Sequence, residues 1–208
     1  MNMISMMENI KKTKLLKTTI LVSCFLFLFC LKATSADAAT TYYVATTGSD
    51  TNPGIQVQPF KTIQKAADTA AGGDTVNIRA GTYNEQVYVK NSSNSIITFQ
   101  NYNNEQVIID GQDTRNYGII FSNSYTANYI TIKGIIVRNV ANRGTSVMAG
   151  IYISSGKHHI LLDSVESHDN QGFGILLDST NNVTIQNSHI HHNGSDGIIV
   201  EGTSAYTT

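Results

Sequence analysis

Two acidic side chains near the end of the sequence could hold a cation between them. Asp178 and Glu201 are separated by an offset of 23 in the sequence, and each follows a short apolar run. If the chain repeats with that period, the two residues occupy equivalent places in adjacent turns and lie side by side. Like charges directly opposite each other on neighbouring strands repel. Either a bound cation or full solvation must offset this repulsion; solvation is the simpler of these two alternatives, and both stay open.

The histidines form a second group with possible chemistry. His168 and His191 are separated by the same offset of 23, and His189 shares with His191 one side of an expected strand. Zinc takes three or four ligands, in structural sites fixed in a tetrahedron. We expect instead an outward-facing polar ladder in which His168 stacks on His191. A zinc site and contact with a sugar through the imidazole faces are the alternatives.

These spacings come from an internal repeat. Equivalent positions of residues 157–180 and 181–203 are separated by a constant offset of 23, and 128–153 has the same outline with an insertion over 141–149. Apolar residues alternate over three to five positions within each unit, which is typical of short strands with one buried face. Stacked units of this size indicate a solenoid. We therefore predict an all-β fold, a right-handed parallel β-helix, with Asn170 stacked on Asn193 at a turn.

Other folds with repeats fit this sequence less well. The leucine-rich repeat has a similar period, but its L-x-x-L-x-L pattern is missing. A two-sheet sandwich would not produce a fixed offset of 23. A solenoid also has to cover the two ends of its column.

One helix is expected before the repeats. Residues 59–71 place Phe60, Ile63, Ala67 and Ala70 at helical spacing, with Pro59 in the first turn and Gly72-Gly73 at the end. We interpret it as the N-terminal cap of the column, within a cap segment 40–73 that precedes rungs over 74–208. No comparable cap follows the last repeat, so we expect missing C-terminal rungs, hence a fragment or an early end, and poor solubility of the isolated chain.

The N-terminal segment 1–39 has the layout of a secretory signal peptide. A basic opening is followed by the uncharged run 18–31 and a short polar stretch with small residues at Ala36 and Ala38. The apolar run is shorter than the ~20 residues that cross a bilayer, which disfavours a membrane anchor. A lipoprotein signal at Cys24 is a further alternative. The domains expected are thus a signal over 1–39 and a β-helix over 40–208, in a secreted protein.

Composition excludes some partners of the mature chain. Residues 40–208 hold nine basic and thirteen acidic side chains, a net charge of −4, and both cysteines precede them. A nucleic-acid partner would require a basic stripe, and no disulfide framework can form. After signal cleavage we expect no membrane partner, and a monomer if the protein is full length.

The segment from Tyr42 to Val87 contains a series of short motifs that carries a resemblance. They are Tyr43-Val44, Gly48-Ser49-Asp50, Asn52-Pro53-Gly54, Pro59-Phe60-Lys61-Thr62-Ile63, Ala66-Ala67, Gly73-Asp74-Thr75-Val76 and Gly81-Thr82-Tyr83. This block resembles the entry module of secreted β-helix proteins that act on polysaccharides, above all the family-nine polysaccharide lyases, which are pectate lyases. The same module opens β-helix proteins of unlike activity, and fold does not imply function.

The resemblance implies the front part of an extracellular lyase that cleaves pectate-like polyuronates by calcium-assisted β-elimination. Calcium binds about six to eight oxygen atoms, and a Lys or Arg serves as the base. The resemblance matches Asp169 and Asp196 to rungs that carry calcium ligands, and with Asp178 and Glu201 they are the expected metal residues. The catalytic base stays unknown, because Lys133, Arg138 and Lys157 lie in no recognisable motif, and the active rungs could follow Thr208.

Two other functions stay open. The first is a noncatalytic β-helix, either a surface or carbohydrate-binding protein or an inactive fragment. The second is an inverting glycoside hydrolase, which needs two or three acids around one groove. An acidic polysaccharide is the expected substrate of the lyase.

Overall fold

The structure is a computed structural model that describes residues 2–7, 11–14, 38–90, 94–141, 144, 147–202 and 205–206. The chain divides into two units, Met1–Asp37 and Ala38–Thr208. In the first unit, residues 3–7 and 11–14 are helical. The apolar run of the expected signal peptide and most of the polar stretch after it lie within 15–37, outside the described residues. Among the helices that are described, none has the length and apolar character needed to cross a bilayer.

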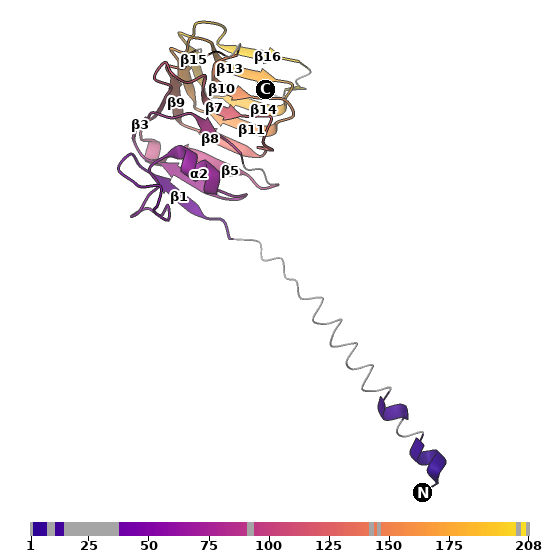
Figure 1. The fold of residues 1–208 in the computed structure, drawn as a ribbon. Helices are drawn as coiled ribbons and strands as arrows, with labels where there is room; N and C mark the ends of the chain where they lie inside the picture. The colour runs from indigo at the N-terminus through magenta and orange to yellow at the C-terminus, as the bar shows by residue number, and fades with distance from the viewer. Residues whose placement is uncertain are drawn as a thin grey trace. The chain divides into compact units, whose positions relative to one another are not determined.

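The second unit is a parallel β-helix built from three sheets (Figure 1). The first sheet contains β1 (Thr41–Val44), β2 (Thr75–Ile78), β5 (Ile97–Asn101), β8 (Ile130–Lys133), β11 (His158–Asp163), β14 (Asn181–Gln186) and β17 (Ala205–Tyr206). The second contains β3 (Gly81–Tyr83), β6 (Val107–Asp110), β9 (Ile135–Arg138), β12 (Glu166–His168) and β15 (His189–His191). The third contains β4 (Val87–Tyr88), β7 (Tyr117–Phe121), β10 (Ala149–Ile153), β13 (Phe173–Asp178) and β16 (Ile198–Glu201).

From β2 onward the chain visits the three sheets in turn, and each complete circuit is one rung. The register confirms the repeat: Ile160 lies beside Val183, Ser167 beside Ile190, and Ile175 beside Ile198. The numbers of each pair differ by the predicted offset of 23. Because side chains alternate along a strand, one set of positions from every rung points inward. These residues form a single buried column of mostly Ile, Val and Leu.

A short helix, α2 (Ile63–Thr69), packs against β1 and β4 and buries Ile63, Ala66 and Ala67 in the same core. It therefore covers the first rung, as the expected cap does. The helix is shorter than the predicted 59–71, and Pro59 is not in its first turn. The reason is that Phe60 pairs with β1: its N–H donates to the Tyr43 carbonyl, and its own carbonyl accepts from Ala45.

Many residues in the turns and near the strand ends of the β-helix have a left-handed backbone. Among them are Asn139, His159, Ser164, Asp169, Ser179, Asn182, Asn187 and His192, all with φ between 48° and 55°. Asn and Asp tolerate this conformation better than most residues. The abundance of Asn, Ser and Gly in the sequence thus reflects the sharp corners between the sheets.

Candidate functional site

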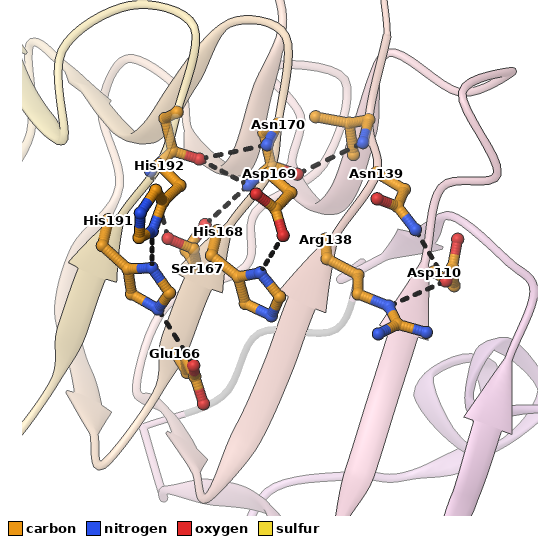
Figure 2. A network of polar contacts seen from close by, with 12 residues as sticks. Asp110, Arg138, Asn139, Glu166, Ser167, His168, Asp169, Asn170, His191 and His192 are labelled. Carbon is orange, nitrogen blue, oxygen red and sulfur yellow. Dashed lines mark hydrogen bonds and ion pairs between the residues drawn. The ribbon is translucent and has the colours of Figure 1, made fainter.

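The outer face of the second sheet carries a row of polar side chains that contact one another (Figure 2). In β12, Ser167 is fully buried, so its neighbours Glu166 and His168 point outward. Ser167 lies beside Ile190 of β15 and Val137 of β9. Because side chains alternate along a strand, Arg138 next to Val137 and His191 next to Ile190 also point to the outer face.

The row begins with an ion pair between the earlier strands. Asp110 at the end of β6 and Arg138 at the end of β9 are register partners, and the Arg138 Nε lies 2.9 Å from Asp110 Oδ2. Asn139 Nδ2 also donates to Asp110 Oδ2 at 3.0 Å. The charge of Arg138 is thus already balanced before the row reaches the histidines.

The two later strands place four polar residues in a square. Glu166 pairs with His189, and His168 pairs with His191. The rings of His168 and His191 stack with centroids 5.0 Å apart and planes within 2°, which confirms the expected ladder. His191 Nε2 lies 3.0 Å from Glu166 Oε1, and the rings of His189 and His191 are 4.1 Å apart.

Asp169 follows this square at the corner after β12. Its Oδ2 lies 2.7 Å from His168 Nδ1, and this hydrogen bond is the main reason that the pKa of the Asp169 carboxyl falls below its usual range. A carboxylate that accepts from an imidazole fixes the ring and its tautomer. Asp169 is therefore an orienting partner of His168 in this structure.

Below the row, a buried asparagine supports the corner. Asn170 Nδ2 donates to Asn193 Oδ1 at 2.9 Å and to Ser167 Oγ at 3.1 Å, while its Oδ1 accepts from the Val140 N–H at 3.2 Å. The Asn170–Asn193 stack expected from the sequence is thus confirmed. The repeated glycines have their reason here, since a Cβ on Gly150 would collide with Ser167 Oγ and Asn170 Nδ2.

A second acidic feature lies on the third sheet. Asp178 and Glu201 are register partners at the ends of β13 and β16, as the offset of 23 predicts. Ser179 Oγ donates to Asp178 Oδ1 at 2.9 Å. Burial raises the pKa of the Tyr152 phenol, and the nearby charges of Asp178 and Glu201 raise it further. The two carboxylates thus add to one negative field on this face.

The other two expected metal residues lie elsewhere. Asp169 begins the corner that joins the second sheet to the third, whereas Asp196 lies at the end of the equivalent corner one rung later. Within the described part of the chain, no three of the four expected acids have ligand atoms close enough to share one ion. The group of three that does so there is Glu166, His189 and His191, whose ligand atoms all lie within 4.8 Å of one another.

The basic residues considered as a catalytic base are engaged within the fold. Lys133 Nζ lies 3.9 Å from Asp163 Oδ2, and Arg138 pairs with Asp110. Lys157 is buried and its Nζ donates to the Ser155 carbonyl at 3.3 Å; burial lowers the pKa of its ammonium group. A lowered pKa suits a base, but the buried position keeps Lys157 from a polymer on the surface.

Comparison with known proteins identifies the family. The model of the Pel9A-like, right-handed β-helix region matches residues 42–205. The chain belongs to this family. Its membership confirms both the predicted fold and the resemblance of the entry module to pectate lyases.

Two relatives by sequence match this chain over only part of their length. The chain is 36% identical over 136 residues to the uncharacterized protein YwoF of Bacillus subtilis, covering 63% of this chain and 29% of that protein. It is 36% identical over 75 residues to pectate lyase PEL9 of Emericella nidulans, covering 34% and 18% of the two. The matched region thus spans less than a third of either relative.

Solved structures show the same architecture. Pectate lyase Pel9A matches with a TM-score of 0.66 at 18% identity, over 81% of this chain and 46% of that one. A rhamnogalacturonan lyase matches with a TM-score of 0.54 at 20% identity, over 80% and 51%. The GH136 lacto-N-biosidase of Eubacterium ramulus matches with a TM-score of 0.60 at 14% identity, over 77% and 40%. At these identities the likeness establishes the fold alone.

The sequence interpretation missed Glu166 as a partner of the histidines. The signal was present, because Glu166 precedes His189 by the same offset of 23 that separates His168 from His191. The sequence, however, places Glu166 outside both the acids that resemble calcium ligands and the group of histidines. A ligand set of one carboxylate and two imidazoles follows only when the outward positions of β12 and β15 are considered together.

Proposed function

We propose that this chain provides part of the β-helix of an extracellular polysaccharide lyase that acts on a pectate-like polyuronate by calcium-assisted β-elimination. The observation that carries the proposal is the family match over residues 42–205. Two relatives by sequence or structure are pectate lyases by name, and a third is a rhamnogalacturonan lyase. A lyase cleaves its substrate by elimination.

The reaction defines what the site must do. A base takes the proton next to the uronate carboxylate, a carbon–carbon double bond forms, and the bond to the 4-linked oxygen breaks. This oxygen leaves with the other sugar chain and takes up a proton from water. A calcium ion would neutralise the uronate carboxylate and make that proton easier to remove. The protein must therefore supply oxygen ligands on an exposed face where a polymer can lie.

Asp178 and Glu201 are the residues that suit such an ion. They are adjacent in register, they lie on the outer face, and both are oxygen donors of the kind calcium prefers. Two carboxylates leave most of the coordination sphere to the uronate, to backbone oxygens and to water. Asp169 and Asp196 stay predicted ligands; the hydrogen bond between Asp169 and His168 makes Asp169 the weaker of these two.

A direct assay tests the proposal. The full chain is incubated with polygalacturonate with and without CaCl₂, and the ultraviolet absorbance of the unsaturated uronate end is followed. Calcium-dependent binding of the polymer is measured in parallel by calorimetry. We expect Asp178→Asn with Glu201→Gln to lower both signals by about tenfold or more, and Asp113→Asn, an exposed turn residue, to leave them unchanged. Reducing ends without absorbance would indicate hydrolysis. The absence of both the unsaturated product and calcium-dependent binding would refute the proposal.

A noncatalytic carbohydrate-binding protein is the second candidate, and one observation favours it. A shallow groove of about 700 Å³ crosses the outer face of the first sheet, lined in part by Tyr129, His159 and Leu161. The rings of Tyr129 and His159 stack 4.5 Å apart. Aromatic faces provide an apolar surface with polar edges, which suits a sugar ring. Binding that Tyr129→Ala abolishes, without any turnover, would support this function.

Export is part of the proposal as well. The segment 1–39 is proposed as the signal peptide that directs the chain out of the cell. The N-terminal sequence of protein recovered from the medium should begin near Ala39. Recovery of the uncleaved chain in the membrane fraction would contradict it.

A further inference from the structure

We propose that Glu166, His189 and His191 form a binding site for one transition-metal cation, of which Zn²⁺ is the representative, on the outer face of the second sheet. The site lies on a different sheet from the Asp178–Glu201 pair, so it does not depend on the proposed lyase function. It would join two successive rungs through their side chains.

The backbone brings the three ligands to one place. Glu166 on β12 and His189 on β15 are register partners, and His191 is two residues further along β15. Adjacent strands lie about 4.8 Å apart and successive residues on one face are about 7 Å apart. Since Ser167 and Ile190 occupy the opposite, inward positions, the three side chains share the outer face.

The ligand atoms are already close to the spacing that a metal ion needs. The Glu166 oxygen and the His189 and His191 nitrogens lie within 4.8 Å of one another, and His191 Nε2 is 3.0 Å from Glu166 Oε1. Zinc binds nitrogen and oxygen ligands at about 2.0–2.2 Å, so ligands of one ion must lie within about 4 Å of each other. His189 is exposed, and rotation of its side chain can close the remaining gap without moving the backbone.

The donor set selects the class of metal. Two imidazoles and one carboxylate suit Zn²⁺ and its neighbours among the first-row transition metals, whereas Ca²⁺ and Mg²⁺ prefer oxygen ligands alone. Three protein ligands leave a fourth position open toward solvent, as in zinc sites that bind a water molecule. The site is therefore distinct in chemistry from the calcium site proposed on the third sheet.

The neighbouring residues orient the ligands. His192 Nδ1 lies 2.6 Å from His191 Nδ1, so the two rings share a hydrogen bond that leaves the Nε2 side of His191 facing Glu166. The ring of His168, held by Asp169, stacks on the ring of His191. Such outer partners fix the ring orientation of metal-binding histidines. Arg138, the register partner of His168, is paired with Asp110 and adds little repulsion.

Metal titration of the full, untagged chain tests the proposal. ZnCl₂ is added in calorimetry and in thermal unfolding followed by circular dichroism, with CaCl₂ as the comparison. We expect one Zn²⁺ per chain and a higher unfolding midpoint, with no such effect from Ca²⁺ at the same concentration. Removing one imidazole in His189→Ala or His191→Ala should lower the Zn²⁺ affinity at least about tenfold, since loss of an outer partner alone costs 10–100-fold.

Matched variants separate a built site from histidines that bind zinc adventitiously. His159→Ala removes an exposed imidazole from the other adjacent pair, His158 and His159, and should leave the affinity unchanged. Glu166→Gln should weaken binding although every histidine remains. Equal loss in His159→Ala, or no loss in Glu166→Gln, overturns the proposal.

A spectroscopic measurement gives an independent readout. Co²⁺ bound to the site should show visible d–d bands of a low-coordinate ion with nitrogen ligands, and these bands should vanish with Zn²⁺. If His191→Ala does not fold, His189→Asn, at an exposed position, carries the test. A spectrum identical to aqueous Co²⁺ in the folded wild-type chain overturns the proposal.

Discussion

At the scale of single residues, Glu105 shows how an acid outside the candidate sites contributes to stability. Its Oε2 lies 3.0 Å from Arg79 Nε and accepts from the Ala80 N–H at 2.6 Å. The hydrogen bond with Arg79, followed by that with Ala80, lowers the pKa of Glu105 below its usual 4.5. The contact thereby links the end of β2 to the turn that follows η1 (Tyr102–Asn104).

This lowered pKa predicts a pH-dependent effect of Glu105→Gln. The unfolded chain takes up the proton first on acidification, so the stabilisation is complete above about pH 4.5 and is lost as pH falls through the lower folded pKa. For a partly exposed ion pair we expect about 1 kcal/mol or less at pH 7, or about 2–4 °C in the unfolding midpoint. Thermal unfolding of both proteins from pH 7 to pH 3 should show the gap closing in acid; a gap of constant size would contradict the prediction.

The residues of the candidate sites were predictable to the extent that the repeat determines them. His168 beside His191, Asp178 beside Glu201 and Asn170 beside Asn193 all follow from one offset. Contacts across corners could not be predicted in this way. The hydrogen bond that Asp169 accepts from His168, for example, forms at a corner where the backbone of Asp169 is left-handed, with φ of 52°.

At the scale of elements, the cap helix depends on residues that are distant in sequence. Thr62 Oγ1 accepts from the Lys65 N–H at 3.0 Å and so forms a local N-cap. The first two N–H groups of the helix, those of Ile63 and Gln64, donate to the carboxylate of Glu85 at 2.9 Å each. Glu85 lies far along the chain, beyond the strands β2 and β3, so helical periodicity could not identify it as an acceptor for the start of the helix.

Truncation of Glu85 should therefore loosen the cap. Glu85→Ala leaves two N–H groups at the helix start without their acceptor, and we expect a loss of about 1–3 kcal/mol in the free energy of unfolding. Burial raises the pKa of Glu85, so its charge is costly there. Glu85→Gln keeps one accepting oxygen without that charge and should lose less. Chemical denaturation of the three proteins gives the order; equal stability of Glu85→Ala and wild type would contradict this role.

At the scale of the whole molecule, the fold was predictable because the β-helix is nearly one-dimensional. Each rung contacts mainly its neighbours, so a repeated pattern of inward apolar residues specifies the stack. The function is less predictable for the same reason. Similar rungs recur in pectate lyase Pel9A and in a lacto-N-biosidase, and the chemistry lies in a few outward residues that the core pattern does not constrain.

This architecture predicts that one rung can be removed without loss of the fold. His158 and Asn181 are register partners, so deletion of 158–180 joins Lys157 to Asn181 at an equivalent backbone position. Strands β14, β15 and β16 should then pair with β8, β9 and β10, and the inward columns should stay aligned. We expect an unchanged shape of the circular dichroism spectrum per residue and a lower midpoint of thermal unfolding, because one interface between rungs is lost.

Deletion of 158–168 alone is the control. It removes β11 and β12 but keeps β13, which breaks the order of the three sheets and should abolish the cooperative transition. If both deletions unfold alike, the rungs are not equivalent units and the register carries less of the stability than the structure indicates.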